Sequence, residues 1–314
     1  MSKNTGKLIF GPVPSRRLGR SLGVDILPLK TCNLNCIYCE LGPTNAYTTE
    51  FVDLVPPKAI ETAFLNYISK ECATFDVVTI TASGEPTLHS ELGEIIETIK
   101  KNIDKPVAVL TNATTLPLPW VREALSKADL VLPSLDAASE ETFRRINRPA
   151  KGIELAPIIK GLIKFREEYR GRLLLEILFV KDVNDSPEEI EALLKYTQQI
   201  CPDEIQINTV ARPPAVGWAS PVGPDKLEEI AKLFGENARV ITSYMGSKER
   251  VSSAPEEDEL LEMIKRRPLS RDDFETLFGP YEKYALEKVG GLVEKGIIER
   301  RLLNNKEFYL VRAK

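Results

Sequence analysis

Three cysteines stand close together in the sequence at Cys32, Cys36 and Cys39, in a C-x3-C-x2-C pattern. Thiolate side chains select zinc or iron–sulfur clusters among the metal groups of proteins. A structural zinc site needs four such ligands, whereas three cysteines can hold a [4Fe-4S] cluster and leave one iron without a protein ligand. The spacing therefore predicts an iron–sulfur cluster with one open iron.

An open iron of this kind can be chelated by the amino and carboxylate groups of S-adenosylmethionine. A reduced cluster can then pass one electron to the sulfonium and release a 5′-deoxyadenosyl radical, while the protein orients the cofactor and excludes water. We therefore expect an enzyme with two cofactors, a [4Fe-4S] cluster and S-adenosylmethionine. Its partners would include a reductant such as a ferredoxin or a flavodoxin.

The alternative is a zinc site with a distant fourth ligand, or three incidental thiols. Cys72, Cys201 and the single histidine, His89, are the candidates for completing such a site. Cys72 lies in a helical pattern and Cys201 stands alone before Pro202, so each is expected to be a small buried hydrophobic residue. A second, auxiliary cluster is not expected, because the chain has no second group of cysteines.

The elements that would position these residues alternate between β-rich runs and helical patterns from residue 21 to about residue 245. Six such units predict an α/β fold with a partial (β/α)6 barrel, in which ligands bind at the carboxyl ends of the strands. The predicted strands are Leu22–Leu27, Val77–Ala82, Val107–Thr111, Leu130–Leu135, Leu173–Val180 and Glu204–Val210. The predicted helices are Pro57–Lys70, Glu91–Asn102, Pro119–Lys127, Ile153–Tyr169 and Pro187–Gln199.

Polar residues follow several of these strands. Gly84 would allow close backbone approach after the second strand, and Glu85 could accept hydrogen bonds from a cationic amino group. Asn112 follows the third strand and could bond a ribose or a carboxylate. Ser134 and Asp136 end the fourth strand and alternate to the same face. Capping of the next helix is the alternative role for these last three residues.

The cysteine pattern, with the aromatic Tyr38 before the last cysteine, resembles the radical S-adenosylmethionine superfamily. The resemblance covers about residues 8–245 and implies that Tyr38 packs near the adenine of the cofactor, although simple loop packing is an alternative. Ser83-Gly84-Glu85-Pro86 is similar to the Gly-Gly-Glu-Pro motif of the superfamily, with Ser83 in place of the first glycine. This resemblance implies that Ser83, Gly84 and Glu85 contact the methionine end of the cofactor. The alternative is that the segment is a plain β-turn without a binding role. Asn184 lies in a segment that is similar to the adenine-side loop.

Three further segments, Gly11–Arg20, Ile146–Pro149 and Gln206–Pro214, resemble wyosine-synthase-like radical enzymes. In the best-known member the substrate is a modified guanosine in transfer RNA. The basic extensions that are specific to transfer RNA binding are not evident in this chain. The resemblance makes a nucleoside in RNA the leading substrate class.

The same segments hold arginines whose forked donors suit a phosphate or a carboxylate, although loop arginines are also ordinary solvated residues. Glu176 is a carboxylate within an apolar strand, so it either faces the barrel lumen or lies at an edge. We expect it to face the lumen and to contact the cofactor. The candidate substrate residues are Arg16, Arg17, Arg20, Arg148, Asn208 and Arg212.

The C-terminal part of the chain predicts a second, small domain. The barrel would occupy residues 1–245, a linker residues 246–255, and a winged-helix-like domain residues 256–314. Its predicted elements are the helices Glu256–Arg267, Arg271–Phe278 and Tyr281–Lys295 and the hairpin strands Ile297–Leu302 and Glu307–Val311. Residues 256–314 carry 12 Lys and Arg against 13 Asp and Glu, whereas readers of nucleic acid normally show a basic face. Clamping the barrel, dimerisation or binding a protein are therefore equal alternatives for this domain.

The whole chain has 314 residues, 43% of them apolar, and a net charge of −4, which argues against holding nucleic acid by bulk electrostatics. It has no apolar run long enough to span a bilayer and no signal-peptide pattern, so we expect a cytoplasmic protein without a membrane partner. The main hypothesis is an enzyme that modifies an anionic substrate. The alternatives are a radical enzyme that acts on a protein or peptide docked by the C-terminal domain, and a DNA-binding sensor that contains a cluster.

Overall fold

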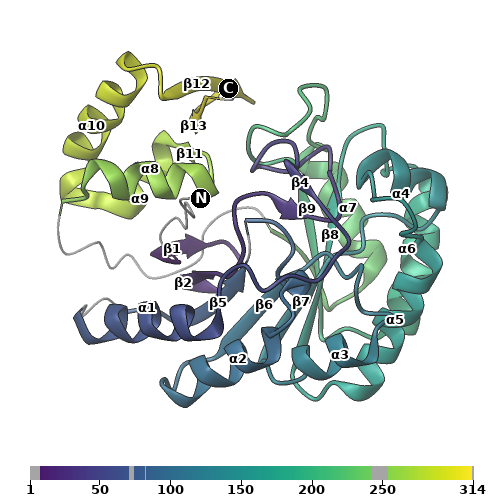
Figure 1. Cartoon of the computed structure of the whole chain (residues 1–314). Helices are drawn as coiled ribbons and strands as arrows, with labels where there is room; N and C mark the ends of the chain where they lie inside the picture. Colours follow the sequence, from purple (N-terminus) through teal and green to yellow (C-terminus); the bar gives the residue numbers. More distant parts are fainter. Residues whose placement is uncertain (1–7, 71–73, 82, 242–253, 313–314) are drawn as a thin grey trace.

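The computed structural model describes residues 8–70, 74–81, 83–241 and 254–312 of the chain. Its centre is one sheet of eight strands in the described residues, in the order β1-β2-β5-β6-β7-β8-β9-β10 (Figure 1). All neighbouring pairs are parallel except β1 and β2. The strands are β1 (Ile9–Ser15), β2 (Gly19–Asp25), β5 (Val77–Thr81), β6 (Val107–Thr111), β7 (Leu130–Pro133), β8 (Arg172–Phe179), β9 (Glu204–Thr209) and β10 (Ala238–Val240).

The register of the sheet places apolar residues in rows across neighbouring strands. Val24 of β2 pairs with Ile80 of β5, Ile80 with Val109 of β6, Val109 with Val131 of β7, and Val131 with Leu173 of β8. All five side chains are fully buried. A parallel sheet that is covered on both faces requires continuous apolar strands, and this requirement explains why six strands could be predicted from their composition.

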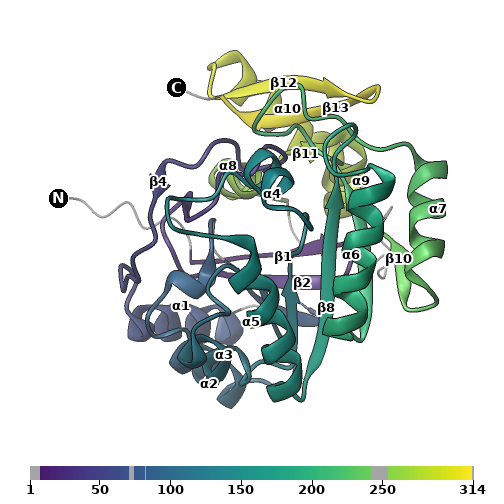
Figure 2. The same cartoon turned by 90° about the vertical axis from the view of Figure 1, so that its right-hand side faces the viewer.

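Helices follow the strands and lie along the outside of the sheet (Figures 1 and 2). Ser186 caps the start of one of them, because its hydroxyl accepts a hydrogen bond from the backbone N–H of Glu189 at 3.3 Å. The helices are α1 (Pro57–Lys70), α2 (Leu92–Lys101), α3 (Pro119–Leu125), α4 (Glu140–Ile146), α5 (Leu155–Glu168), α6 (Pro187–Ile200) and α7 (Pro224–Phe234). None of the described helices is both long and apolar enough to cross a membrane.

Four of these elements, β1, β10, α4 and α7, were not predicted. β1 reads as irregular because of Pro12 and Pro14, which an edge strand tolerates since it needs only one ladder of hydrogen bonds. β10 has three residues and forms the other edge. The six predicted strands are confirmed as neighbours in a parallel sheet, which is an α/β arrangement that fits a partial barrel.

A second hydrophobic core lies within residues 257–311 and includes Phe274, Val289 and Tyr309. Its elements are α8 (Glu257–Arg266), β11 (Leu269–Ser270), α9 (Arg271–Phe278), α10 (Glu282–Glu294), β12 (Ile298–Leu303) and β13 (Lys306–Val311). The predicted helices and hairpin are present, Ser270 and Asp273 form a capping box at the start of α9, and β11 adds a third strand in the order β11-β13-β12. We call this part the C-terminal domain; its assignment as a winged helix stays a prediction. Most of the predicted linker lies outside the described residues.

Candidate active site

The three cysteines lie on the loop that follows β2, which includes the short strand β3 (Thr31–Cys32) paired with β4 (Ala46–Tyr47). We call residues 30–42 the cysteine loop. The segment after β5 packs directly on it: the backbone N–H of Glu85 donates to the carbonyl of Thr31 at 3.0 Å. Gly84 is required at this contact, because a Cβ added there would collide with the backbone of Thr31. The Ser-Gly-Glu-Pro segment therefore positions the cysteine loop.

Two other segments hold the far side of the cysteine loop. The backbone N–H of Ile37 donates to the carbonyl of Ile146 at the end of α4, at 2.9 Å. The backbone N–H of Val216, in the segment after β9, donates to the carbonyl of Ile37 at 3.0 Å. The loop is thus fixed by backbone contacts to parts of the chain that are distant in sequence.

The cysteine side chains are available as ligands for a metal group. All three are free thiols, and amide groups donate to two of the sulfurs: Asn112 to Cys32 at 3.7 Å and Asn147 to Cys36 at 3.4 Å. Burial raises the pKa of the Cys39 thiol to about 11, so a cationic metal centre would be needed to keep such thiolates ionised. No three His, Cys, Asp or Glu side chains of the described residues converge on one metal position. A cubane does not require such convergence, since each cysteine binds a different iron.

The residues proposed to complete a zinc site are engaged elsewhere or lie outside the described residues. His89 is buried and its Nε2 lies 2.8 Å from the carbonyl oxygen of Val55. Cys201 is exposed at the end of α6, so the prediction that it is buried was wrong. Its backbone adopts φ 50°, and this left-handed cap turns the residue out of the helix packing. Cys72 lies outside the described residues.

Glu85 is fully occupied by protein donors. Its Oε1 accepts hydrogen bonds from the hydroxyls of Thr87 and Thr111 at 2.5 and 2.6 Å, and its Oε2 accepts the backbone N–H of Asn112 at 2.6 Å. Burial raises the pKa of Glu85, although these hydrogen bonds act against the shift. Its carboxylate joins the ends of β5 and β6, so in this structure it orders the strand ends. Contact with a cofactor amino group stays a prediction.

A second polar network surrounds Asp136. Its Oδ2 accepts hydrogen bonds from the Tyr38 hydroxyl at 2.5 Å and from Asn147 at 2.8 Å. Burial raises the pKa of Asp136 to about 6. Asn184 is also used internally, because its amide donates to the carbonyls of Asp136 and Leu178. This network fixes the ring of Tyr38 beside the cysteines. Ser134, two residues before Asp136 in the sequence, forms a β-bridge with Glu176.

Glu176 faces the lumen, as predicted, and is paired across it. Its Oε2 lies 2.6 Å from Nη1 of Arg17, and its Oε1 accepts a hydrogen bond from Asn208 at 2.8 Å. Burial alone would raise the pKa of Glu176, but Arg17 and Asn208 outweigh burial and lower it. Arg16 and Arg17 come from the turn between β1 and β2, where the Ser15 hydroxyl accepts the backbone N–H of Arg17 at 3.3 Å. This turn therefore brings the edge hairpin across to β8 and β9.

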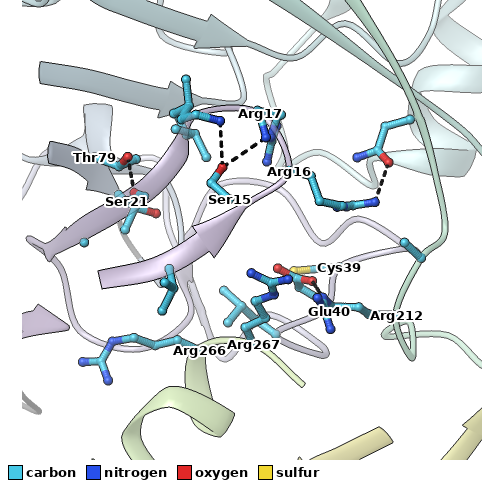
Figure 3. A pocket seen from close by; sticks show the side chains of 18 of the residues that line it. Ser15, Arg16, Arg17, Ser21, Cys39, Glu40, Thr79, Arg212, Arg266 and Arg267 are labelled. Carbon is cyan, nitrogen blue, oxygen red and sulfur yellow. Dashed lines mark hydrogen bonds and ion pairs between the residues drawn. The ribbon is translucent and has the colours of Figure 1, made fainter. Parts of the chain in front are cut away.

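A cavity of about 370 Å³ lies between the barrel and the C-terminal domain (Figure 3). The barrel supplies Cys39, Tyr38 and Glu176 to its wall, and the C-terminal domain supplies Arg266 and Arg267. The other predicted residues at this cavity are Ser83, Arg16, Arg17, Asn208 and Arg212. Tyr38 also borders a smaller cavity of about 20 Å³ with Asn112, Ser134 and Asp136.

Two buried ion pairs join the C-terminal domain to the barrel. Nη1 of Arg212 lies 2.8 Å from Oδ2 of Asp273, and Nε of Arg266 lies 3.0 Å from Oδ2 of Asp25. Asp25 also accepts hydrogen bonds from the backbone N–H and the hydroxyl of Ser83 at 2.9 and 2.6 Å. The C-terminal domain thus forms one wall of the cavity, and its docking reaches the segment that packs on the cysteine loop.

Sequence reasoning placed two arginines in the site that the structure does not bring there. Arg20 lies at the start of β2, where its backbone N–H donates to Asp76 at 2.6 Å, and it does not border the cavity. Arg148 is also absent from the cavity wall, and its carbonyl accepts the Tyr47 hydroxyl. The direction of β2 explains why Arg20 lies outside the cavity. Ligands bind at the carboxyl ends of the strands, and Arg20 is near the amino end of β2.

Other residues of the site were not predicted from the sequence. Asn147 touches a cysteine sulfur, and the segment that contains it was recognised without its role. Asp25 lies within the predicted strand Leu22–Leu27, but β2 ends at Asp25, so the rule that found Asn112 would have required the true end of this strand. Glu40, Arg266 and Arg267 could not have been found, because they meet only when the two domains dock.

Comparisons with known proteins agree with this geometry. The family model of the Radical SAM superfamily matches residues 26–196. The chain is 34% identical to "GTPase Obg" of Brachyspira hyodysenteriae over 99% of its own length, but spans only 46% of that protein. It is also 34% identical to a "UPF0026 protein" of Helicobacter pylori, covering 93% of this chain and 98% of that one.

Among solved structures, TYW1 with a lysine-pyruvate adduct bound gives a TM-score of 0.53 at 20% sequence identity. The match covers 70% of this chain and 74% of that chain. At this level of identity the likeness concerns the fold alone.

Proposed function

The chain belongs to the radical SAM superfamily, and on this premise we propose that Cys32, Cys36 and Cys39 bind a [4Fe-4S] cluster that cleaves S-adenosylmethionine. Enzymes of this family use these two cofactors, and the cluster supplies the electron that generates a 5′-deoxyadenosyl radical. The observation that carries the proposal is the cysteine loop, which borders a cavity through Cys39 and has amide donors on two of its sulfurs.

The chain's own residues would orient the cofactor and exclude water. Tyr38 is fixed by Asp136 next to the cysteines, and Gly84 sets the distance between the cysteine loop and the segment after β5. Glu176 presents a paired carboxylate to the lumen, within reach of a ribose hydroxyl or an amino group. The C-terminal domain forms one wall of the cavity, which limits the access of solvent to a reactive radical from that side.

The substrate is proposed to be anionic. Five arginines border the cavity, against the carboxylates of Glu40 and Glu176. Segments that resemble wyosine-synthase-like enzymes contribute Arg16, Asn208 and Arg212 to it, which supports a nucleoside in RNA as the leading substrate class. The docking of Arg266 and Arg267 against the cavity supports a role of the C-terminal domain at the active site over the reading of DNA.

The test is the formation of 5′-deoxyadenosine by anaerobically reconstituted protein with dithionite and S-adenosylmethionine, measured by liquid chromatography. We expect product from the wild type, no product from Cys36→Ala, and wild-type product from Cys201→Ala, whose exposed thiol is remote from the site. Product from Cys36→Ala at the wild-type rate would refute the cluster assignment.

A second experiment separates the substrate classes. Protein purified anaerobically from native cells should carry RNA fragments if the substrate is a nucleoside in RNA. If a second protein co-purifies at a fixed stoichiometry and no RNA is found, the result would instead support the alternative in which the C-terminal domain docks a polypeptide substrate.

A further inference from the structure

Arginines from both domains share one corner of the cavity. Arg16 comes from the β1–β2 turn, Arg212 from the segment after β9, and Arg267 from the end of α8. Figure 3 shows Arg212 and Arg267 beside Glu40 and Cys39. Burial, followed by the charge of Arg212, lowers the pKa of Arg267 to about 10, and Arg16 contributes in the same direction. The charges of Arg16 and Arg212 therefore both act on Arg267, and the charge of Arg212 also acts on Arg16.

The carboxylates of this corner are too few for three cations. Asp273 is shared, with Oδ2 at 2.8 Å from Nη1 of Arg212 and Oδ1 at 3.4 Å from Nη2 of Arg267. Glu40 lies 3.3 Å from Nε of Arg212. Among the residues that the structure describes, Asp273 and Glu40 are the carboxylates that pair with Arg212 and Arg267, and neither pairs with Arg16. A buried charge is costly unless a ligand of opposite charge compensates it.

Arg16 carries the excess. Its Nη1 donates only long hydrogen bonds, to Oδ1 of Asn208 at 3.5 Å and to the carbonyl of Ile241 at 3.4 Å. In the part of the chain that the structure describes, no carboxylate forms an ion pair with it. Burial lowers the pKa of Arg16, and the more distant carboxylates of Glu40 and Glu176 only oppose this shift.

We infer that Arg16 and Arg267 form a two-sided clamp for a phosphate or carboxylate group of the substrate. The inference rests on the proposed function and deepens it, because it makes the C-terminal domain part of the substrate site. A planar guanidinium from each domain can donate two hydrogen bonds to such a group. Binding of the anion would also hold the C-terminal domain against the barrel.

Binding of inorganic pyrophosphate to the full-length protein, measured by isothermal titration calorimetry, tests the clamp without radical chemistry. We expect Arg16→Ala and Arg267→Ala each to weaken binding by about tenfold or more, since a charge-assisted hydrogen-bond pair is lost. Arg16→Lys should keep part of the affinity. Arg20→Ala is the matched control, because this arginine lies four residues after Arg16 in the sequence but outside the cavity, and it should bind as the wild type does.

Two further measurements make the result decisive. Malonate in place of pyrophosphate distinguishes a carboxylate site from a phosphate site. The anion that binds more tightly identifies the group of the substrate that the clamp holds. Binding of S-adenosylmethionine by equilibrium dialysis should be unchanged in the Arg16 and Arg267 variants. Circular dichroism melting curves confirm that each variant is folded.

Equal affinity of the wild type and Arg16→Ala for both anions would overturn the clamp, as would loss of S-adenosylmethionine binding in place of anion binding. These outcomes are separate from failure of the proposed function. If 5′-deoxyadenosine forms but no anion binds, the clamp is wrong and the radical chemistry stands. If anions bind and no 5′-deoxyadenosine forms, the anion site stands without the proposed reaction.

Discussion

Amide donors to the cysteine sulfurs are the residue-scale feature with the most direct consequence for electron transfer. Asn147 donates to Cys36 and Asn112 donates to Cys32. Hydrogen bonds to cluster sulfurs stabilise the reduced, more negative state, and they are one determinant of the reduction potential. The sequence shows two asparagines, but only the fold shows that they meet sulfur atoms.

Asn147→Leu should therefore make the reduction potential of the cluster more negative, because a donor to the Cys36 sulfur is removed. A redox titration followed by electron paramagnetic resonance measures this shift. Asn102→Leu serves as the control, since this asparagine is exposed and its side chain donates to the carbonyl of Thr98 on α2. An unchanged or more positive potential in Asn147→Leu would show that this amide does not act on the cluster.

At the scale of elements, the contact between the cysteine loop and the segment after β5 decides whether the site forms. Gly84 lies against the backbone of Thr31, which cannot move aside without moving Cys32. The identity of this glycine could be noticed in the sequence through its motif. A glycine is needed at position 84 because two backbone segments pack against each other there. This packing cannot be inferred from the pattern of a single sequence.

Gly84→Ala should destabilise the protein by about 1–3 kcal/mol or more and should lower the iron and sulfide content after reconstitution. Urea unfolding and iron analysis measure the two effects. Gly217→Ala is the matched control, because nothing lies within 4 Å of its added Cβ, and it should stay within about 0.5 kcal/mol of the wild type. Full iron content in a stable Gly84→Ala protein would contradict this account of the loop.

The regular part of the fold followed from the sequence, and the irregular part did not. Val78, Val109 and Val131 belong to strands that are buried on both faces, so their composition alone predicts a central parallel sheet. The edge strands β1 and β10 carry prolines or are short, and such elements depend on their neighbours. Short β-strands of this kind have weak local signals because packing decides them.

At the scale of the whole molecule, the C-terminal domain is part of the site. Its elements were predictable from helix periodicity and from the capping box at Ser270, but its position was not. Arg266 pairs with Asp25, and Arg212 pairs with Asp273. These ion pairs could not be inferred from the mixed charge of the domain sequence. Contacts between domains have no sequence signal when each partner also looks like an ordinary surface charge.

The Arg266–Asp25 pair gives a test of domain docking. Both side chains are less than one-tenth exposed, so Arg266→Met should cost about 3–5 kcal/mol by leaving Asp25 as a buried charge. The double variant Asp25→Asn with Arg266→Met should lose less, because no charge is stranded. Urea unfolding of the wild type, both single variants and the double variant measures the coupling; additive losses would show that the two residues do not interact.

The same pair predicts a pH dependence. Burial already raises the pKa of Asp25, and loss of Arg266 should raise this pKa further. The folded state then holds a proton that the unfolded state releases, so stability should fall as the pH rises above the ordinary range of an aspartate. The deficit of Arg266→Met should be small near pH 4 and largest near neutrality, whereas the double variant should show no such trend. A deficit that grows toward acid pH would contradict this assignment.

The central claim is that the cysteine loop holds a cluster with an iron open to S-adenosylmethionine. The most direct measurement is the electron paramagnetic resonance spectrum of the reduced, reconstituted protein before and after the cofactor is added. The account predicts a reduced [4Fe-4S] signal that changes on addition of S-adenosylmethionine in the wild type and in Cys201→Ala, and no such signal in Cys36→Ala. A cluster signal that S-adenosylmethionine leaves unchanged, or one that persists in Cys36→Ala, would contradict it.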